Sequence, residues 1–269
     1  MLDTTQKRQK PKLTDQQINQ YLARIKTPRE NQLSSRYLKL LHRNHLLHIP
    51  FENLDIHMHR EIILDIDRIF YKVLIQRRGG FCFELNGLFY SLLQSLGFDT
   101  HLIGASVYDA SGGVGPALSH AAILTSVNQS TYLCDVGFGD AFLTPKLLYP
   151  GEIQMDYNRY YRMDKNLDGQ YILSKSEDSL RYQPIYLFSK QAYQLIEFID
   201  MCHYHQTSSK SHFTQNKIIT QAKMDGRITL TDKKFIINKL GVHQEQNILN
   251  PDEFCALLRQ HFGIEYLEK

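Results

Sequence analysis

The sequence lacks the features that mark membrane, nucleic-acid-binding and disulfide-stabilised proteins. No apolar run approaches the length needed to cross a bilayer. The formal net charge of +3 is too small to indicate nucleic acid as a partner. The four cysteines include no CxxC pair, and residues 1–10 are polar and show no signal peptide. We therefore expect reduced thiols, a cytoplasmic location and no membrane partner.

Internal repeats and low-complexity segments are also absent. The chain has 269 residues, of which 42% are hydrophobic and 22% are charged, as in an ordinary globular protein. That length suffices for one large domain or for two to three small ones. Nothing in the sequence fixes the oligomeric state.

Helical periodicity dominates the first third of the chain. A capping box at residues 14–17 precedes apolar residues at helical spacing, and a second helix is expected around residues 33–41, before Pro50. A third apolar stripe has the spacing of a helix with one buried face: Leu85, Leu88, Phe89, Leu92, Leu93 and Leu96. We predict a helical domain over residues 1–98.

The middle third changes to short runs of β-branched and apolar residues separated by turns. The predicted strands are residues 101–107, 121–127, 131–136, 159–163 and 171–173. We interpret residues 99–190 as an antiparallel, β-barrel-like domain.

The last third mixes the two kinds of pattern. Residues 191–201 look helical, residues 227–230 and 234–237 look like strands, and Pro251 follows a good helix cap. Residues 191–269 are therefore predicted to form a small α/β lid domain. The fold class of the whole chain is α+β.

Cys82 lies at a point where chemistry is expected. Gly79 and Gly80 should form the turn before the third helix, which puts Cys82 in its first turn. There the free N–H groups and the helix dipole favour a thiolate, and Arg77 and Arg78 add positive charge. Such a cysteine can be a nucleophile, although a free cysteine is more often a small buried hydrophobe.

His120 and Asp135 each stand beside an apolar strand of the middle third. Neighbouring antiparallel strands could bring them together. An imidazole can take the proton of a thiol, and a carboxylate can orient that imidazole and stabilise its charge. On spacing alone, the better interpretation of His120 is a core histidine, and that of Asp135 is a turn residue before Gly137.

Three histidines, His42, His45 and His48, are spaced three apart and could share one face of a helix. No acidic fourth ligand follows in pattern, so we expect no metal site there or elsewhere.

The motifs resemble those of the arylamine N-acetyltransferase family. The resemblance includes residues 49–54 (Ile-Pro-Phe-Glu-Asn-Leu), residues 78–86 (Arg-Gly-Gly-Phe-Cys-Phe-Glu-Leu-Asn), His120 and residues 135–139 (Asp-Val-Gly-Phe-Gly). Residues of the last third, including Thr207 and Ser208, fit the family's third-domain pattern, although Ser209 stands where the family often has proline. The resemblance covers nearly the whole chain in the right order.

The resemblance implies a role for each of these residues. Cys82 would be the nucleophile, His120 the base and Asp135 its orienting partner, in a triad like that of cysteine proteases. Phe138 would form an aromatic wall of the acceptor pocket, and Tyr204 would contact coenzyme A.

The resemblance also implies the reaction, which is transfer of an acetyl group from acetyl-coenzyme A to an arylamine or arylhydrazine. It would follow a ping-pong mechanism through acetyl-Cys82, as in xenobiotic metabolism. The alternative is a cysteine hydrolase: a papain-like protease, an amidase or a transglutaminase-like enzyme. These share the chain order of cysteine, histidine and acid, but the motif from Arg78 to Glu84 speaks against them.

Overall fold

The computed structural model describes residues 12–157 and 159–265. Residues 1–11, on which the expectation about a signal peptide rests, lie outside this range. Within the described residues, no helix is long and apolar enough to cross a membrane.

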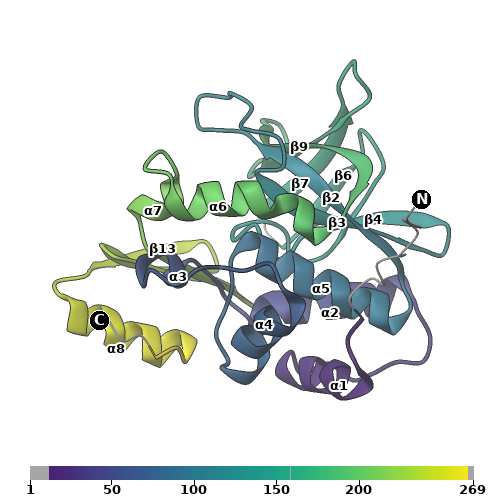
Figure 1. Ribbon diagram of the computed structural model, residues 1–269. Coiled ribbons are helices and arrows are strands. Elements are labelled where there is room, and N and C mark those ends of the chain that lie inside the picture. The colour runs from purple at the N-terminus through teal and green to yellow at the C-terminus, as the bar shows by residue number, and fades with distance from the viewer. Residues whose placement is uncertain (1–11, 158, 266–269) are drawn as a thin grey trace, which may run out of the picture.

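Five α-helices and one π-helical turn form most of the first third of the chain (Figure 1). They are α1 (Asp15–Arg24), α2 (Ser35–His48), α3 (Leu54–His57), α4 (Ile66–Phe70), η1 (Tyr71–Ile75) and α5 (Cys82–Leu96). Thr14 forms the predicted capping box at α1. The second predicted helix starts two residues after Leu33 and ends at His48, before Pro50.

Helix α5 is the central element of the largest hydrophobic core. It begins at Cys82, where the Glu84 carboxylate accepts the N–H of Phe81, and it ends at Gly97 in the left-handed region (φ 99°). The sequence predicted one buried stripe, yet every residue from 82 to 93 is buried. The reason is that α1 and α4 pack against one side of α5, while strands of the large sheet cover the other.

The middle of the chain forms an eight-stranded antiparallel sheet, with strand order β5-β4-β3-β2-β9-β8-β7-β6. The strands are β2 (Asp99–Val107), β3 (His120–Val127), β4 (Ser130–Cys134), β5 (Lys146–Leu147), β6 (Ile153–Asp156), β7 (Arg159–Lys165), β8 (Tyr171–Ser176) and β9 (Gln183–Tyr193). His120 therefore opens β3, and Asp135 comes directly after β4.

Side chains join the two edge strands of this sheet. The amide of Gln154 donates to the Leu147 carbonyl (2.8 Å) and accepts the Leu147 N–H (2.7 Å). The buried Lys146 ammonium lies 2.8 Å from the Asp156 carboxylate. These contacts between β5 and β6 bring the sheet close to a closed barrel, as the sequence predicted.

A second, five-stranded sheet forms most of the last third, with strand order β1-β10-β11-β12-β13. Its strands are β1 (Phe51–Glu52), β10 (Ile218–Lys223), β11 (Gly226–Thr231), β12 (Lys234–Lys239) and β13 (Val242–Asn247). Helix α8 (Pro251–Phe262) packs against β11. Strand β1 comes from the motif around Pro50, so the first and last thirds of the chain share this sheet.

The prediction of a helix over residues 191–201 was wrong for its first part. Strand β9 continues to Tyr193 because Ala192 and Tyr193 pair with Ile103 and Leu102 of β2. A short 3-10 helix (Leu195–Phe198) then leads into α6 (Ile199–Thr207), and α7 (His212–Gln215) follows. The α+β fold class is confirmed, while domain boundaries after residues 98 and 190 stay predictions.

Candidate active site

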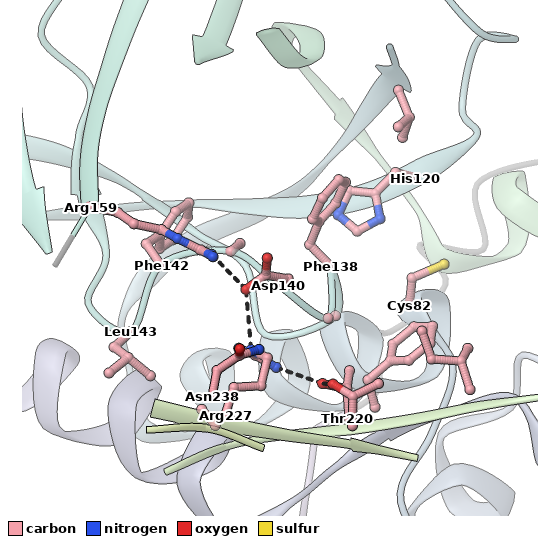
Figure 2. A pocket seen from close by; sticks show the side chains of 18 of the residues that line it. Cys82, His120, Phe138, Asp140, Phe142, Leu143, Arg159, Thr220, Arg227 and Asn238 are labelled. Carbon is pink, nitrogen blue, oxygen red and sulfur yellow. Dashed lines mark hydrogen bonds and ion pairs between the residues drawn. The ribbon is translucent and has the colours of Figure 1, made fainter. Parts of the chain in front are cut away.

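A cavity of about 920 Å³ lies between the large sheet, helix α5 and the C-terminal sheet. Cys82, His120 and Phe138 line it at one end, as Figure 2 shows. Arg159 and Arg227 line it at the other end. All three thirds of the chain therefore contribute to one cavity.

Cys82 is the first residue of α5 and is 4% exposed. Burial raises the pKa of its thiol well above the usual value, and the nearby Cys202 thiol raises it further, whereas the Phe83 N–H lowers it. The pKa of Cys82 is thus not lowered by the helix start alone. A thiolate at this position needs an adjacent cation.

Arg78 does not supply that cation. Its guanidinium donates to Asp55 (2.7 Å) and to Glu52 (2.7 Å), and all three side chains are buried. Arg77 is exposed at the surface. The sequence-based expectation that these two arginines favour a Cys82 thiolate is therefore wrong for Arg78, because its charge is already paired.

Lys72 completes this buried ion network. Its ammonium lies 2.8 Å from Glu84 and 2.6 Å from Asp55. Glu84 also accepts the Phe81 N–H that caps α5. The glutamate of the motif at residues 78–86 thus caps α5 at Phe81, one residue before Cys82, and Arg78 is linked to it through Asp55 and Lys72.

His120 and Asp135 lie beside each other, as the antiparallel strand arrangement predicted. The Nε2 atom of His120 is 2.8 Å from Oδ2 of Asp135, and both side chains are buried. Since Nε2 is engaged, Nδ1 is the ring nitrogen left for chemistry. Figure 2 shows the His120 ring above Cys82, with Phe138 beside the ring.

The Asp135 carboxylate accepts three further hydrogen bonds. Tyr186 Oη donates to Oδ2 (3.1 Å), while the Asn86 amide (2.9 Å) and the Gly137 N–H (3.0 Å) donate to Oδ1. Burial alone would raise the pKa of Asp135. The charge and the hydrogen bond of His120, together with the bonds from Asn86 and Gly137, outweigh burial, so the pKa of Asp135 is lowered. Asp135 is therefore an ionised carboxylate at neutral pH.

Asn86 connects this carboxylate to the cysteine helix. It lies one turn after Cys82 on α5, donates to the Ala121 carbonyl (2.6 Å) and accepts the Val136 N–H (2.9 Å). Gly137 passes so close to α5 that an added Cβ would lie 2.7 Å from the Cys82 carbonyl oxygen. These contacts fix the cysteine helix against the segment that carries Asp135.

Sequence reasoning did not assign roles to Asn86, Tyr186 or His42. Asn86 belongs to the motif at residues 78–86, which was the available signal. Tyr186 had no local signal, because it reaches Asp135 from β9, 51 residues away. His42 belongs to the histidine cluster considered for zinc, and it accepts the Asp135 N–H instead (3.0 Å).

The near end of the cavity is rich in aromatic rings. Phe138 contacts the His120 ring edge-to-face, with centroids 5.2 Å apart. Phe51 of β1 and Phe213 of α7 also line the cavity, and both rings contact Phe81, the residue before Cys82, with centroids 5.8 Å and 4.7 Å away. Tyr204 is half-buried on α6 and is not among the residues that line the cavity. Its ring contacts the ring of His205, and His205 does line the cavity.

The far end of the cavity carries a cluster of polar side chains beside Phe142 and Leu143 (Figure 2). Asp140 accepts from Arg159 (2.7 Å) and lies 3.2 Å from Nε of Arg227. Arg227 also donates to the Thr220 hydroxyl (3.1 Å). A bound molecule would thus meet rings near Cys82 and hydrogen-bonding groups away from it.

No metal cluster occurs among residues 12–157 and 159–265, where no three histidine, cysteine or acidic side chains gather in a suitable way. The three histidines considered for zinc have other partners. His45 contacts the Tyr21 hydroxyl (2.6 Å), and His48 contacts the Asn44 carbonyl (2.9 Å).

Comparison with known proteins places the chain in a family. A sequence model described as N-acetyltransferase matches residues 36–269. The arylamine N-acetyltransferase / N-hydroxyarylamine O-acetyltransferase of Salmonella typhimurium is 32% identical over 231 residues, which are 84% of this chain and 81% of that protein. The arylamine N-acetyltransferase of Escherichia coli is 30% identical, over 92% and 88% of the two chains.

Comparison with solved structures supports the same family. The arylamine N-acetyltransferase structure from Salmonella typhimurium matches with a TM-score of 0.89 and 28% identity, over 95% of this chain and 96% of that one. One from Bacillus cereus, described as having a unique Cys-His-Glu catalytic triad, matches with a TM-score of 0.86 and 26% identity, over 94% and 100%. The chain belongs to the arylamine N-acetyltransferase family and is an acetyltransferase.

Proposed function

We propose that Cys82, His120 and Asp135 form the catalytic triad of this acetyltransferase, with acetyl-coenzyme A as donor and an aromatic amine or hydrazine as acceptor. The observation that carries the proposal is the hydrogen bond between His120 Nε2 and Asp135, which leaves Nδ1 for the cavity that Cys82 also lines. Membership of the family gives the reaction, and this geometry supports the assignment of roles.

The first half of the reaction loads the enzyme. The Cys82 thiol gives its proton to Nδ1 of His120, and the thiolate attacks the thioester carbonyl of acetyl-coenzyme A. Because burial raises the pKa of Cys82, the thiolate exists as a pair with the imidazolium, whose charge Asp135 stabilises. Collapse of the tetrahedral intermediate expels coenzyme A, which takes the proton and leaves acetyl-Cys82.

The second half transfers the acetyl group. The amine nitrogen attacks the carbonyl of acetyl-Cys82 while His120 removes the proton from nitrogen. The C–S bond then breaks, releasing the amide and restoring the thiolate–imidazolium pair. Backbone N–H groups at the start of α5, with that of Phe83 foremost, are suitable donors for the oxyanion in both halves.

The acceptor class follows from the near end of the cavity. An aryl ring would pack among Phe51, Phe138 and Phe213. Aryl amines are largely neutral at pH 7, so their nucleophilic lone pair is available in an apolar site. Neither a nucleic acid nor a membrane enters the proposed reaction, which would take place in the cytoplasm.

Tyr204 remains a proposed contact for coenzyme A. It lies on α6 next to His205, and His205 lines the cavity. The coenzyme would therefore reach Tyr204 only where it extends past the cavity wall.

A cysteine hydrolase is the rival function for such a triad, with water attacking acyl-Cys82 in place of the amine. The relatives named above are described as acetyltransferases. The aromatic near end of the cavity also fits an aryl acceptor.

Initial-rate kinetics test the proposal. Because Cys82 cannot hold the acetyl group and coenzyme A at once, double reciprocal plots at fixed acceptor concentrations should be parallel lines. Cys82→Ala should abolish turnover. Converging lines, or an Ala variant that still acetylates an aniline, would point to direct transfer. Steady acetate release without aryl amine would indicate the hydrolase.

A further inference from the structure

His42 is a buried histidine whose two ring nitrogens have different partners. It lies on α2 and is 0% exposed. Nε2 is 3.0 Å from the backbone nitrogen of Asp135, and Nδ1 is 2.9 Å from the carbonyl oxygen of Leu143. An amide N–H can only donate and a carbonyl can only accept, so Nε2 is bare and Nδ1 carries the proton. The partners thus fix one neutral tautomer.

The two partners of His42 bracket one irregular segment, residues 135–143, which we call the cavity-wall segment. It has no helix or strand along its length, and residues 137–143 all line the cavity. Asp135 at its start bonds His120, and Phe138 within it contacts the His120 ring. A segment without regular backbone pairing depends on such side-chain bonds for its position.

Ring packing reinforces both hydrogen bonds. The imidazole of His42 stacks on Phe142 of the cavity-wall segment, with centroids 5.6 Å apart and planes 14° apart. Its edge contacts Phe89 of the cysteine helix α5 (5.9 Å). His42 therefore contacts the helix that carries Cys82 and both ends of the segment that carries Asp135.

We propose that His42 is a positioning residue that aligns the triad through the Asp135 backbone and, through Leu143, anchors the other end of the cavity-wall segment, which places Phe138 in the acceptor pocket. The proposal rests on the proposed role of Asp135. Loss of the Asp135 bond should slow acetylation of Cys82, whereas loss of the Leu143 bond should weaken acceptor binding. Even a small misplacement of a catalytic group can cost a large factor in rate.

Two amide variants separate these bonds. In His42→Gln, the side-chain oxygen can take the place of Nε2 and accept the Asp135 N–H, but the bond to Leu143 is lost. In His42→Asn, the amide nitrogen can take the place of Nδ1 and donate to Leu143, but the bond to Asp135 is lost. Both variants remove the same aromatic packing, so their difference reports on the hydrogen bonds.

His45 provides the matched control. It lies on the same helix, is also 0% exposed and also contacts Phe89, with centroids 5.4 Å apart. Its hydrogen-bonding contact is with Tyr21 on α1, away from the cavity. His45→Gln should lower stability as a core substitution does, while leaving both half-reactions near the wild-type rate.

The experiment measures acetylation of Cys82 at saturating acetyl-coenzyme A and the KM for an aniline acceptor. His42→Asn should slow the acetylation of Cys82 by about 10-fold or more, while the KM for acetyl-coenzyme A should stay unchanged. His42→Gln should acetylate within about 3-fold of wild type but show a raised acceptor KM. Equal loss in both variants, or an equal loss in His45→Gln, would overturn the proposal.

Two further results are decisive. If His42→Asn does not fold, His42→Gln decides alone: near-normal acetylation with a raised acceptor KM supports the proposal, and slowed acetylation contradicts it. If wild-type protein carries no acetyl group on Cys82, the triad assignment fails and this proposal falls with it. If wild-type Cys82 is acetylated and the His42 variants behave like wild type, the proposed role of His42 is wrong, while the triad assignment stands.

Discussion

At the scale of single residues, the site depends on how buried polar groups are satisfied. Asp135 keeps its charge because donors from three different elements and its own loop surround it. Cys82 has no such support for its thiolate, since burial raises the pKa of the thiol. In the proposed triad, ionisation of Cys82 is therefore coupled to transfer of its proton to His120.

Substitution of the orienting carboxylate tests this coupling. Asp135→Asn keeps the shape of the side chain but removes the charge that stabilises the imidazolium. Acetylation of Cys82 should slow by a factor on the order of 10² or more. The rate of coenzyme A release in the first turnover measures the rate of this acetylation. Asp178→Asn, in an exposed turn, is the control. A folded Asp135→Asn protein with the wild-type rate would refute the triad.

A second residue-scale prediction concerns pH. Burial lowers the pKa of His42 to about 4, so the folded protein holds it neutral. In the unfolded chain its pKa is about 6.5, so the unfolded state binds the extra proton first. Its contribution to stability is complete above pH 6.5 and is lost as pH falls to about 4. The loss is roughly 3 kcal/mol, at 1.36 kcal/mol per pKa unit.

Urea unfolding at a series of pH values between 7 and 4 measures this loss. His42→Gln removes the titrating group, so its stability should fall less steeply with acid than that of wild type. Parallel curves for the two proteins would contradict the assignment of His42 as buried and neutral.

At the scale of elements, the buried ion network explains the motif around Cys82. Arg78 and Lys72 bind carboxylates from β1, α3 and α5. Removing one partner of such a network leaves buried charge unpaired, which is far more costly than losing a surface pair. The arginine and glutamate of the motif therefore belong to the framework that presents Cys82.

Lys72→Met tests this role. The variant leaves Glu84 and Asp55 short of a partner, so the free energy of unfolding should fall by about 3–5 kcal/mol. Arg29→Met breaks the exposed pair of Arg29 with Asp15 and should cost less than about 1 kcal/mol. Urea unfolding at pH 7 compares them. Similar losses of unfolding free energy in the two variants would show that the buried ion network contributes little to the stability of the fold.

Element types were largely predictable from local pattern, but their pairing was not. The helix start at Cys82 and the strand before Asp135 follow from glycines and apolar runs within a few residues. The extension of β9 to Tyr193 depends on β2, about 90 positions earlier. The pairing of Phe51 with Thr220 and the bond from Tyr186 to Asp135 also join distant segments. Local patterns carry no information about such contacts.

At the scale of the whole molecule, every third of the chain contributes to one cavity. Helix α5 provides Cys82, the large sheet provides His120 and the approach to Asp135, and the C-terminal sheet provides Thr220 and Arg227. Strand β1 pairs with β10, which ties the first third to the last. The cavity thus depends on the assembled fold. The proposed triad likewise joins residues up to 53 positions apart in the sequence, from Cys82 to Asp135.

Mass spectrometry of the intact protein after acetyl-coenzyme A, without any acceptor, tests the central claim most directly. The account predicts one added acetyl group, located on Cys82 by peptide analysis, and its loss when an aryl amine is added. Cys82→Ala should remain unmodified. Acetylation at another residue, or no acetylation of wild-type protein that still converts the amine, would contradict it.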